Sequence, residues 1–323
     1  MLTQQQINLT PSTYPPNGRY DLDISFRSSG HDLQLPVILI RGAKPGKTLL
    51  ITAGVHGDEY EGVRTIFDIT RELDPAAMSG DVLCAPVCNP PAFWEVTRCS
   101  PLDGGNLARV FPGKQDGSPT EAIAWHIDQH LMPHADFYID LHSAGVRCLM
   151  PTMVGYEAGD ARAEAAARSF GAPVIWAHDV IAPGRTISSA RDRGIPWLYS
   201  EARGAGRIHP EDLAVYRTGV VNLLRHLRIL PGEPAAGPPA YFLWGDGNID
   251  ASITTSKQGF LQPAVELLES VSQGQLLGTL LDLHGRTLEQ YTAPRAGIVA
   301  MIHICPVIRG GDPLFLITGA RQP

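Results

Sequence analysis

The stretch Thr48-Leu-Leu-Ile-Thr-Ala-Gly54-Val-His56-Gly-Asp-Glu59-Tyr-Glu61-Gly62 connects an apolar run to a segment with helical periodicity. The run from Thr48 to Ala53 predicts a buried strand. From Glu61 to Leu73, apolar side chains recur mostly every three or four residues, which predicts an amphipathic helix. A strand that leads straight into a helix is typical of an α/β sheet covered by helices, and ligands usually bind where such a strand ends.

The same alternation of apolar runs and helical segments continues from Asp21 to about Gly204. Predicted strands cover Pro36 to Arg41, Thr48 to Ala53, Asp81 to Val87, Asp136 to Leu141, Pro173 to Trp176 and Ile195 to Tyr199. Predicted helices cover Glu61 to Leu73, Thr120 to Leu131, Asp160 to Phe170 and Glu211 to Leu230. This pattern predicts an α/β fold, a sheet flanked by helices.

A proline-rich segment follows the last predicted helix. Residues 231–239 read Pro-Gly-Glu-Pro-Ala-Ala-Gly-Pro-Pro, which neither continues a helix nor pairs as a central strand. The residues after it contain short apolar runs between glycines and almost no helical periodicity. We therefore expect an α/β domain over residues 1–232 and a small β-rich domain over residues 233–323.

Composition excludes several classes of protein. Lys and Arg number 26 and Asp and Glu 33, a net charge of −7, so a nucleic-acid partner is not expected. No apolar run approaches the roughly 20 residues of a membrane span, and the first eighteen residues lack the features of a signal peptide. Five cysteines without a CxxC pair indicate reduced thiols. These features predict a cytoplasmic protein with no membrane partner.

Two segments suggest a metal site. His56 and Glu59 lie three residues apart in a strand-to-helix loop, and His142 ends the apolar run that begins at Phe137. Two histidines and a glutamate suit Zn²⁺ with a fourth position open to water. Asp140, two residues before His142, lies on the same side of the strand and would orient its imidazole. The alternative is that His142 and Asp140 merely pair with each other.

Three further residues add candidate chemistry. Arg98 and Arg109 lie in a loop-rich stretch, and a guanidinium fork can hold a carboxylate or polarise an amide oxygen. Glu201 ends another apolar run, ahead of a glycine-rich turn. A glutamate in that position would accept a proton from a metal-bound water.

These segments, in this order, resemble the succinylglutamate desuccinylase/aspartoacylase family, a branch of the zinc carboxypeptidase-like hydrolases. The resemblance covers most of residues 40–230, and the proline-rich linker and small C-terminal β domain are in keeping with it. It implies a zinc-carboxypeptidase-like mixed sheet in a catalytic domain over residues 1–232. It also implies one Zn²⁺ per chain, held by His56, Glu59 and His142.

The resemblance further implies the roles of the remaining site residues. Glu201 matches the glutamate that activates water and protonates the leaving nitrogen. Arg98 matches the arginine that polarises the scissile carbonyl, and Arg109 matches the one that holds a substrate carboxylate, next to Asn106.

Two departures from the family pattern concern substrate binding. The family's NLNR motif reads Asn106-Leu-Ala108-Arg109 here, so the asparagine that helps Arg109 is missing. Arg203 follows Glu201 where the family has an LGGGG-like run. If Arg203 points inward, it replaces the lost carboxylate contact or holds Glu201 ionised.

The resemblance implies a deacylase that hydrolyses the amide bond of an N-acyl amino acid or similar small amide, with resemblance to deacetylases of acetylated diamino acids. Two alternatives stay open: a metallocarboxypeptidase acting on short peptides, and a metal-binding module without catalysis. The expected partner is a small N-acylated substrate. Enzymes of this size are commonly homo-oligomers, and the subunit count stays open.

Overall fold

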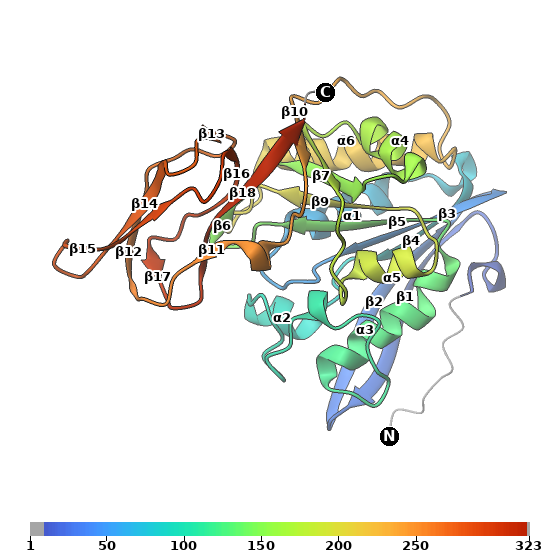
Figure 1. Ribbon diagram of the computed structural model, residues 1–323. Helices are drawn as coiled ribbons and strands as arrows, with labels where there is room; N and C mark the ends of the chain where they lie inside the picture. Colours follow the sequence, from blue (N-terminus) through green and yellow to red (C-terminus); the bar gives the residue numbers. More distant parts are fainter. Residues whose placement is uncertain (1–9, 322–323) are drawn as a thin grey trace.

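A large mixed sheet forms the centre of the computed structural model, which describes residues 10–321 (Figure 1). Within that range it has fourteen strands, and a separate antiparallel sheet of four strands lies in the C-terminal part. The predicted α/β fold, with a sheet flanked by helices and a β-rich C-terminal part, is confirmed.

The strands of the large sheet follow one path, with two short strands beside it. In spatial order they are β1 (Gly18–Ser28), β2 (His31–Arg41), β4 (Ser79–Ala85), β3 (Lys44–Ala53), β5 (Phe137–Ser143), β9 (Trp197–Ala202), β7 (Met153–Glu157), β8 (Val174–His178), β10 (Tyr241–Trp244), β18 (Pro313–Arg321), β16 (Gly297–His303) and β13 (Ser270–Val271). Off this path, β11 (Ile253–Thr254) pairs with β18 and β6 (Cys148–Leu149) with β16. The small sheet has the order β15 (Thr287–Thr292), β14 (Leu276–Leu281), β12 (Gly259–Pro263) and β17 (Val307–Ile308).

The parallel strands β3, β5 and β9 are neighbours in the middle of the large sheet. Because parallel strands end at the same edge, the loops after β3 and the last residues of β5 and β9 meet there. In the register of β5 and β9, His142 lies opposite Glu201. The topology alone therefore brings the predicted site residues of three distant segments together.

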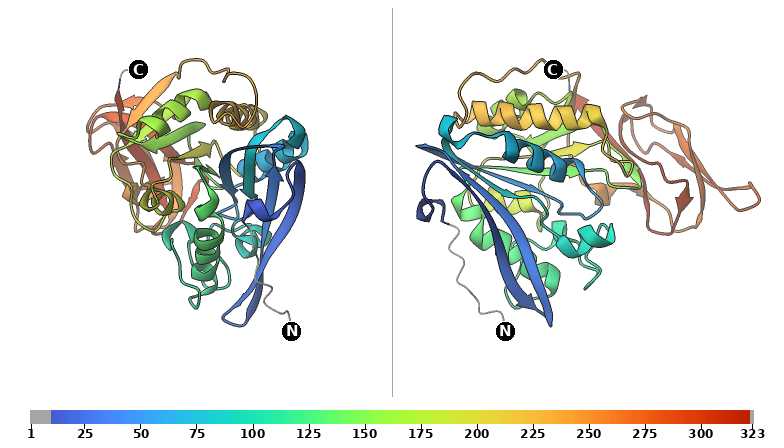
Figure 2. Two further views of the ribbon diagram at one scale, coloured as in Figure 1. Left: turned by 90° about the vertical axis from the view of Figure 1, so that its right-hand side faces the viewer. Right: turned by 180° about the vertical axis from the view of Figure 1, so that it is seen from behind.

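Helices cover both faces of the sheet, as Figure 2 shows. They are α1 (Glu61–Glu72), α2 (Pro90–Glu95), α3 (Pro119–His130), α4 (Ala161–Phe170), α5 (Thr186–Asp192) and α6 (Pro210–His226). On one face, Ile66 of α1, Phe170 of α4 and Leu223 of α6 share a buried cluster. On the other face, Ile123 of α3 and Ile187 of α5 belong to a second cluster. The amphipathic helices thus bury their apolar faces against a sheet that is apolar on both sides.

Several elements were not predicted. These include β1, β7, α2 and α5, and α6 ends at His226 rather than at Leu230. Strand β7 runs antiparallel to β9, and it contains Gly155, which weakens a strand signal in the sequence.

The sheet continues past the proline-rich linker. Strand β10, at residues 241–244, pairs with β8 on one side and with β18 on the other. The division between residues 1–232 and 233–323 stays a prediction. Within residues 10–321, no helix combines the length and apolarity that crossing a membrane requires. Residues 1–9, on which the absence of a signal peptide partly depends, lie outside the described range.

Candidate metal centre and active site

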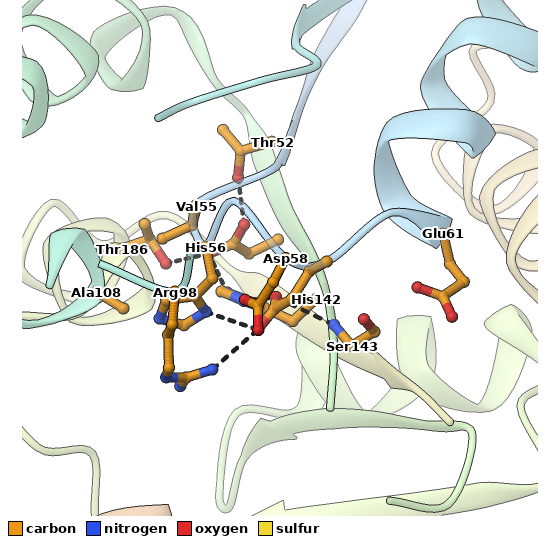
Figure 3. Close-up of polar contacts among 12 residues, drawn as sticks. Thr52, Val55, His56, Asp58, Glu61, Arg98, Ala108, His142, Ser143 and Thr186 are labelled. Carbon is orange, nitrogen blue, oxygen red and sulfur yellow. Dashed lines mark hydrogen bonds and ion pairs between the residues drawn. The ribbon is translucent and has the colours of Figure 1, made fainter. Parts of the chain in front are cut away.

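The structure brings the three predicted metal ligands to one point, and Figure 3 labels two of them, His56 and His142. One side-chain ligand atom each from His56, Glu59 and His142 lies within 4.8 Å of the others. Nδ1 of His56 lies 2.7 Å from Glu59 Oε1, and Nδ1 of His142 lies 2.9 Å from Glu59 Oε2. Two imidazole nitrogens and a carboxylate that converge in this way form a donor set that suits Zn²⁺.

The other imidazole nitrogens have partners of their own. His142 Nε2 donates to Asp140 Oδ2 at 2.9 Å, and His56 Nε2 donates to Asn106 Oδ1 at 3.2 Å. Both oxygens accept, so each Nε2 carries a hydrogen, and each Nδ1 would be free to ligate a cation once it carries none. Although burial lowers it, the pKa of His142 lies well above its usual value because of the neighbouring Asp140 and Glu59, so without a cation its Nδ1 also carries a hydrogen. His142 therefore pairs with Asp140 through Nε2 while its Nδ1 faces the other two candidate ligands.

Asp140 is itself held in place. It is fully buried, and Thr52 donates to its Oδ1 at 2.6 Å while the Thr186 hydroxyl donates to Oδ2. Although burial raises it, the pKa of Asp140 lies below its usual value because of the neighbouring His142 and these hydrogen bonds. An ionised carboxylate thus supports the imidazole of His142.

Two glycines allow the loop after β3 to place its ligands. A Cβ at Gly57 would lie 2.0 Å from the backbone carbon of Ala92, and a Cβ at Gly62 would lie 2.6 Å from Leu141 Cβ. Such distances are too short for any side chain, so the loop and the first turn of α1 approach their neighbours only with glycine at these positions. This explains the glycines that flank His56 and Glu59 in the sequence.

Without a cation, the donor set stabilises its own charges. Burial raises the pKa of Glu59, but the neighbouring His56 and His142 hold it well below its usual value. Burial and the charge of Arg98 lower the pKa of His56 to about 4. Arg98 Nη1 also donates to Glu59 Oε1 at 3.1 Å. Arg98 therefore lies directly beside the ligand set, where the predicted role in carbonyl polarisation requires it.

Glu201 lines the same cavity, which has a volume of about 730 Å³. Its Oε2 is buried and has no hydrogen-bond partner among the described residues. Burial, and then the negative charge of Glu59, raise the pKa of Glu201 to about 8. A buried carboxyl group with a raised pKa next to a metal donor set has the properties of a general base and acid.

The predicted substrate-binding residues lie in different places. Arg109 lines the cavity, but its guanidinium makes two hydrogen bonds of 2.9 Å to the carboxylate of Asp250. Asn106 contacts His56, as described above. Arg203 lies 3.4 Å from Asp212 and is absent from the cavity wall formed by the described residues.

Other cavity residues were missed from the sequence. Arg185 lines the cavity and donates to Asn248 Oδ1 at 2.6 Å, and His178 and Tyr199 form a hydrogen-bonded pair on its wall. Arg185 lies near no motif, and its contacts with Asn248 and Asp250 join residues more than sixty positions apart. The sequence could have indicated Tyr199, because a residue two positions before Glu201 in the same strand lies on the same face of the sheet as Glu201.

Comparison with known proteins shows the family of this chain. A family model described as the succinylglutamate desuccinylase/aspartoacylase catalytic domain matches residues 45–227, more than half of the chain. The chain belongs to the succinylglutamate desuccinylase/aspartoacylase family. The predicted family resemblance is thereby confirmed, and the matched range of this family member contains every predicted site residue.

Individual relatives cover nearly the whole chain. The N-alpha-acetyl-L-2,4-diaminobutyric acid deacetylase of Halomonas elongata is 31% identical over 293 residues, which are 88% of this family member and 85% of that protein. The product-bound ectoine utilization protein EutE (DoeB) from Ruegeria pomeroyi has a TM-score of 0.86 at 28% identity, covering 94% and 96% of the two chains. A succinylglutamate desuccinylase/aspartoacylase from Rhodobacter sphaeroides has a TM-score of 0.84 at 28% identity, covering 95% and 97%.

Proposed function

We propose that this chain is a zinc-dependent deacylase that hydrolyses the amide bond of a small N-acyl amino acid, with one Zn²⁺ per chain. The observation that carries the proposal is the convergence of His56, Glu59 and His142 beside the unpartnered carboxylate of Glu201 and the guanidinium of Arg98. The deacetylase of Halomonas elongata, whose name denotes an N-acetylated diamino acid, supports this substrate class.

The donor set fits a zinc ion, because two imidazole nitrogens and a carboxylate converge on one place, and imidazoles ligate Zn²⁺ in their neutral form. A bound Zn²⁺ supplies a Lewis acid that polarises a carbonyl oxygen and acidifies water. Asp140 keeps His142 in the tautomer that ligation needs, and Asn106 does the same for His56.

Glu201 and Arg98 perform the proton transfer and the charge stabilisation. In its ionised form, Glu201 would accept the proton of the attacking water with its free oxygen and then deliver that proton to the departing nitrogen. Arg98 donates hydrogen bonds to the carbonyl oxygen as negative charge develops on it. Both side chains line the cavity that would contain the scissile amide.

A substrate carboxylate would bind to Arg109 by displacing Asp250, because that carboxylate now occupies the guanidinium fork. Arg203 is bound to Asp212 and would contact a substrate only after leaving it. We therefore propose that Arg109, rather than Arg203, recognises the substrate carboxylate.

The test is a metal-dependent hydrolysis assay on the purified chain. Its metal content is measured, the metal is removed by a chelator, and Zn²⁺ is added back while products are measured from N-acetyl, N-succinyl and N-formyl amino acids and from dipeptides. The proposal expects hydrolysis of an N-acyl amino acid that is lost and regained with the metal. Preferential cleavage of dipeptides would favour a carboxypeptidase, and metal binding without any turnover would favour a non-catalytic module.

A further inference from the structure

Helix α6 presents two buried polar side chains to the strand ends that carry the site. Asp212 lies in the first turn of α6, and Tyr216 follows one turn later, so the two lie on the same face of the helix. Their exposed fractions are 2% and 0%. Neither belongs to the cavity wall formed by the described residues, so neither is in position to contact a substrate there.

Tyr216 holds the main chain of a candidate metal ligand. Its hydroxyl donates a hydrogen bond of 2.6 Å to the carbonyl oxygen of His142. The nitrogen of the same peptide group belongs to Ser143, and it donates to Glu59 Oε2 at 3.1 Å. Because a peptide group is a rigid plane, a contact that fixes its oxygen also fixes its N–H. Tyr216 therefore orients a peptide that carries one candidate ligand and binds another.

Asp212 holds the chain around Glu201. Its Oδ2 accepts from the backbone N–H of Arg203, two residues after Glu201, at 3.3 Å. Its Oδ1 accepts from the Thr152 hydroxyl at 2.6 Å. Thr152 directly precedes Met153, which lies opposite Glu201 in the register of β7 and β9. One carboxylate thus ties together the two strands that meet at Glu201.

Arg203 supplies the charge that the buried carboxylate needs. Its Nη2 lies 3.4 Å from Asp212 Oδ1, and its side chain is partly exposed. A carboxylate that is removed from water requires a paired charge and hydrogen bonds to its oxygens, and Asp212 has both. The first turn of a helix also favours negative charge. This contact gives Arg203 a role that involves no substrate.

The turn after Glu201 packs directly on the segment after His142. A Cβ at Gly204 would lie 2.8 Å from both Ala144 Cβ and the carbonyl oxygen of Gly145. The main chains of Gly204 and Leu149 also form a β-bridge. Because no space separates the two segments, a displacement of one must shift the other.

We infer that Asp212 and Tyr216 are positioning residues of the active site, through which α6 sets where Glu201 lies relative to the candidate metal ligand His142. The part that concerns Asp212 rests on the proposed function, because it requires Glu201 to take part in hydrolysis. The part that concerns Tyr216 requires only metal binding. Small displacements matter in such a site, since a shift of about 1 Å can lower turnover about 100-fold.

The first test measures kcat and KM of the zinc-loaded full chain on the N-acyl amino acid that the wild-type enzyme hydrolyses best. Asp212→Asn keeps the shape of the side chain but removes its charge, so it should lower kcat about 10- to 100-fold and leave KM within about threefold. Asp128→Asn is the matched control and should keep kcat within about twofold. Asp128 is likewise buried and accepts from a hydroxyl and an arginine, those of Ser189 and Arg193, but it lies outside the cavity wall.

A milder pair of variants tests the same contact with less risk to folding. Thr152→Val removes the hydroxyl that binds Asp212 at nearly constant shape, whereas Thr152→Ser keeps a hydroxyl. The valine variant should lower kcat about 3- to 10-fold, the effect expected for one hydrogen bond. The serine variant should keep at least about half of the wild-type kcat.

The second test measures the Kd for Zn²⁺ by competition with a chromogenic chelator, and it needs no activity. Tyr216→Phe removes the hydrogen bond to the His142 carbonyl oxygen, so the Kd should rise about 3- to 10-fold. Asp212→Asn should leave the Kd within about twofold. Tyr291→Phe, which removes the hydroxyl of another buried tyrosine in the small sheet, is the control and should also leave it within about twofold.

A folded Asp212→Asn enzyme with the wild-type kcat overturns the role of Asp212, and so does an equal loss in Asp128→Asn. If Asp212→Asn does not fold, equal kcat values for Thr152→Val and Thr152→Ser overturn that role. An unchanged Zn²⁺ Kd in Tyr216→Phe overturns the role of Tyr216. A wild-type chain that hydrolyses no N-acyl amino acid refutes the proposed function and with it the role of Asp212, while the Kd of Tyr216→Phe still decides on Tyr216.

Discussion

Replacing Asp140 with asparagine tests the metal centre without touching a ligand. The aspartate is fully buried and accepts hydrogen bonds from Thr52, Thr186 and His142. Asparagine has the same shape and keeps one acceptor oxygen, but it loses the charge that supports the imidazole. Loss of such a carboxylate weakens metal binding about 10- to 100-fold, which corresponds to about 1.4–2.8 kcal/mol.

The assay is competition for Zn²⁺ with a chromogenic chelator of known affinity, which yields the Kd of each variant. Asp128→Asn is the matched control, because Asp128 is also buried and hydrogen-bonded, to Ser189 and Arg193, but contacts no proposed ligand. We expect its Kd to stay within threefold of the wild type. An Asp140→Asn protein with an unchanged Kd, or an Asp128→Asn protein weakened equally, would refute the assignment of Asp140 as the support of His142.

Three more predictions concern single side chains. Arg98→Ala, compared at equal metal content because Arg98 also contacts Glu59, should lower turnover about 10²- to 10³-fold, and normal turnover would contradict its role. In the folded, metal-free protein the pKa of Glu201 is about 8, whereas in the unfolded chain it has its ordinary value. Between about pH 5 and 8 the Glu201 carboxyl group is therefore protonated only in the folded state, so the free energy of unfolding decreases as the pH rises through this range. Glu201→Gln should flatten this fall in Tm against pH, and an unchanged slope would contradict the burial of a protonated Glu201. Val96 is β-branched with φ of 55° and is 53% exposed, so Val96→Gly should stabilise the protein by about 1 kcal/mol in calorimetry, whereas a lower Tm would show that its packing outweighs its strain.

Local patterns in the sequence were sufficient to predict the centre of the fold. The apolar run at residues 48–53 corresponds to β3, and the helical periodicity at residues 61–73 corresponds to α1. Both could be predicted because the spacing of apolar residues in the sequence shows which side chains are buried. His56, Glu59, His142 and Glu201 all lie at strand ends or in the loop that follows one. Parallel strands bring such positions to one edge of the sheet, which the sequence pattern could predict. Their convergence depends also on β3, β5 and β9 being neighbours, which strand patterns alone do not reveal and the family resemblance implied.

Contacts between distant segments could not be predicted in this way. The pairing of Arg109 with Asp250 spans 141 residues, and no local pattern connects them. Arg203 follows Glu201 by two residues, but β9 ends at Ala202, so strand alternation no longer determines where its side chain points. It binds Asp212 in the first turn of α6 instead. Strand β7 was missed because Gly155, which the ring of Tyr199 requires, breaks its apolar pattern.

The continuity of the large sheet has a consequence for how the enzyme matures. Strand β10 lies between β8 and β18, and the segment directly after it supplies Asp246 and Gly247 to the cavity wall. During synthesis on the ribosome, β18 is the last of these strands to emerge. The cavity wall includes Asp312 and Pro313, so it is complete only after nearly the whole chain has been synthesised, whereas the candidate metal ligands His56, Glu59 and His142 are all synthesised in its first half.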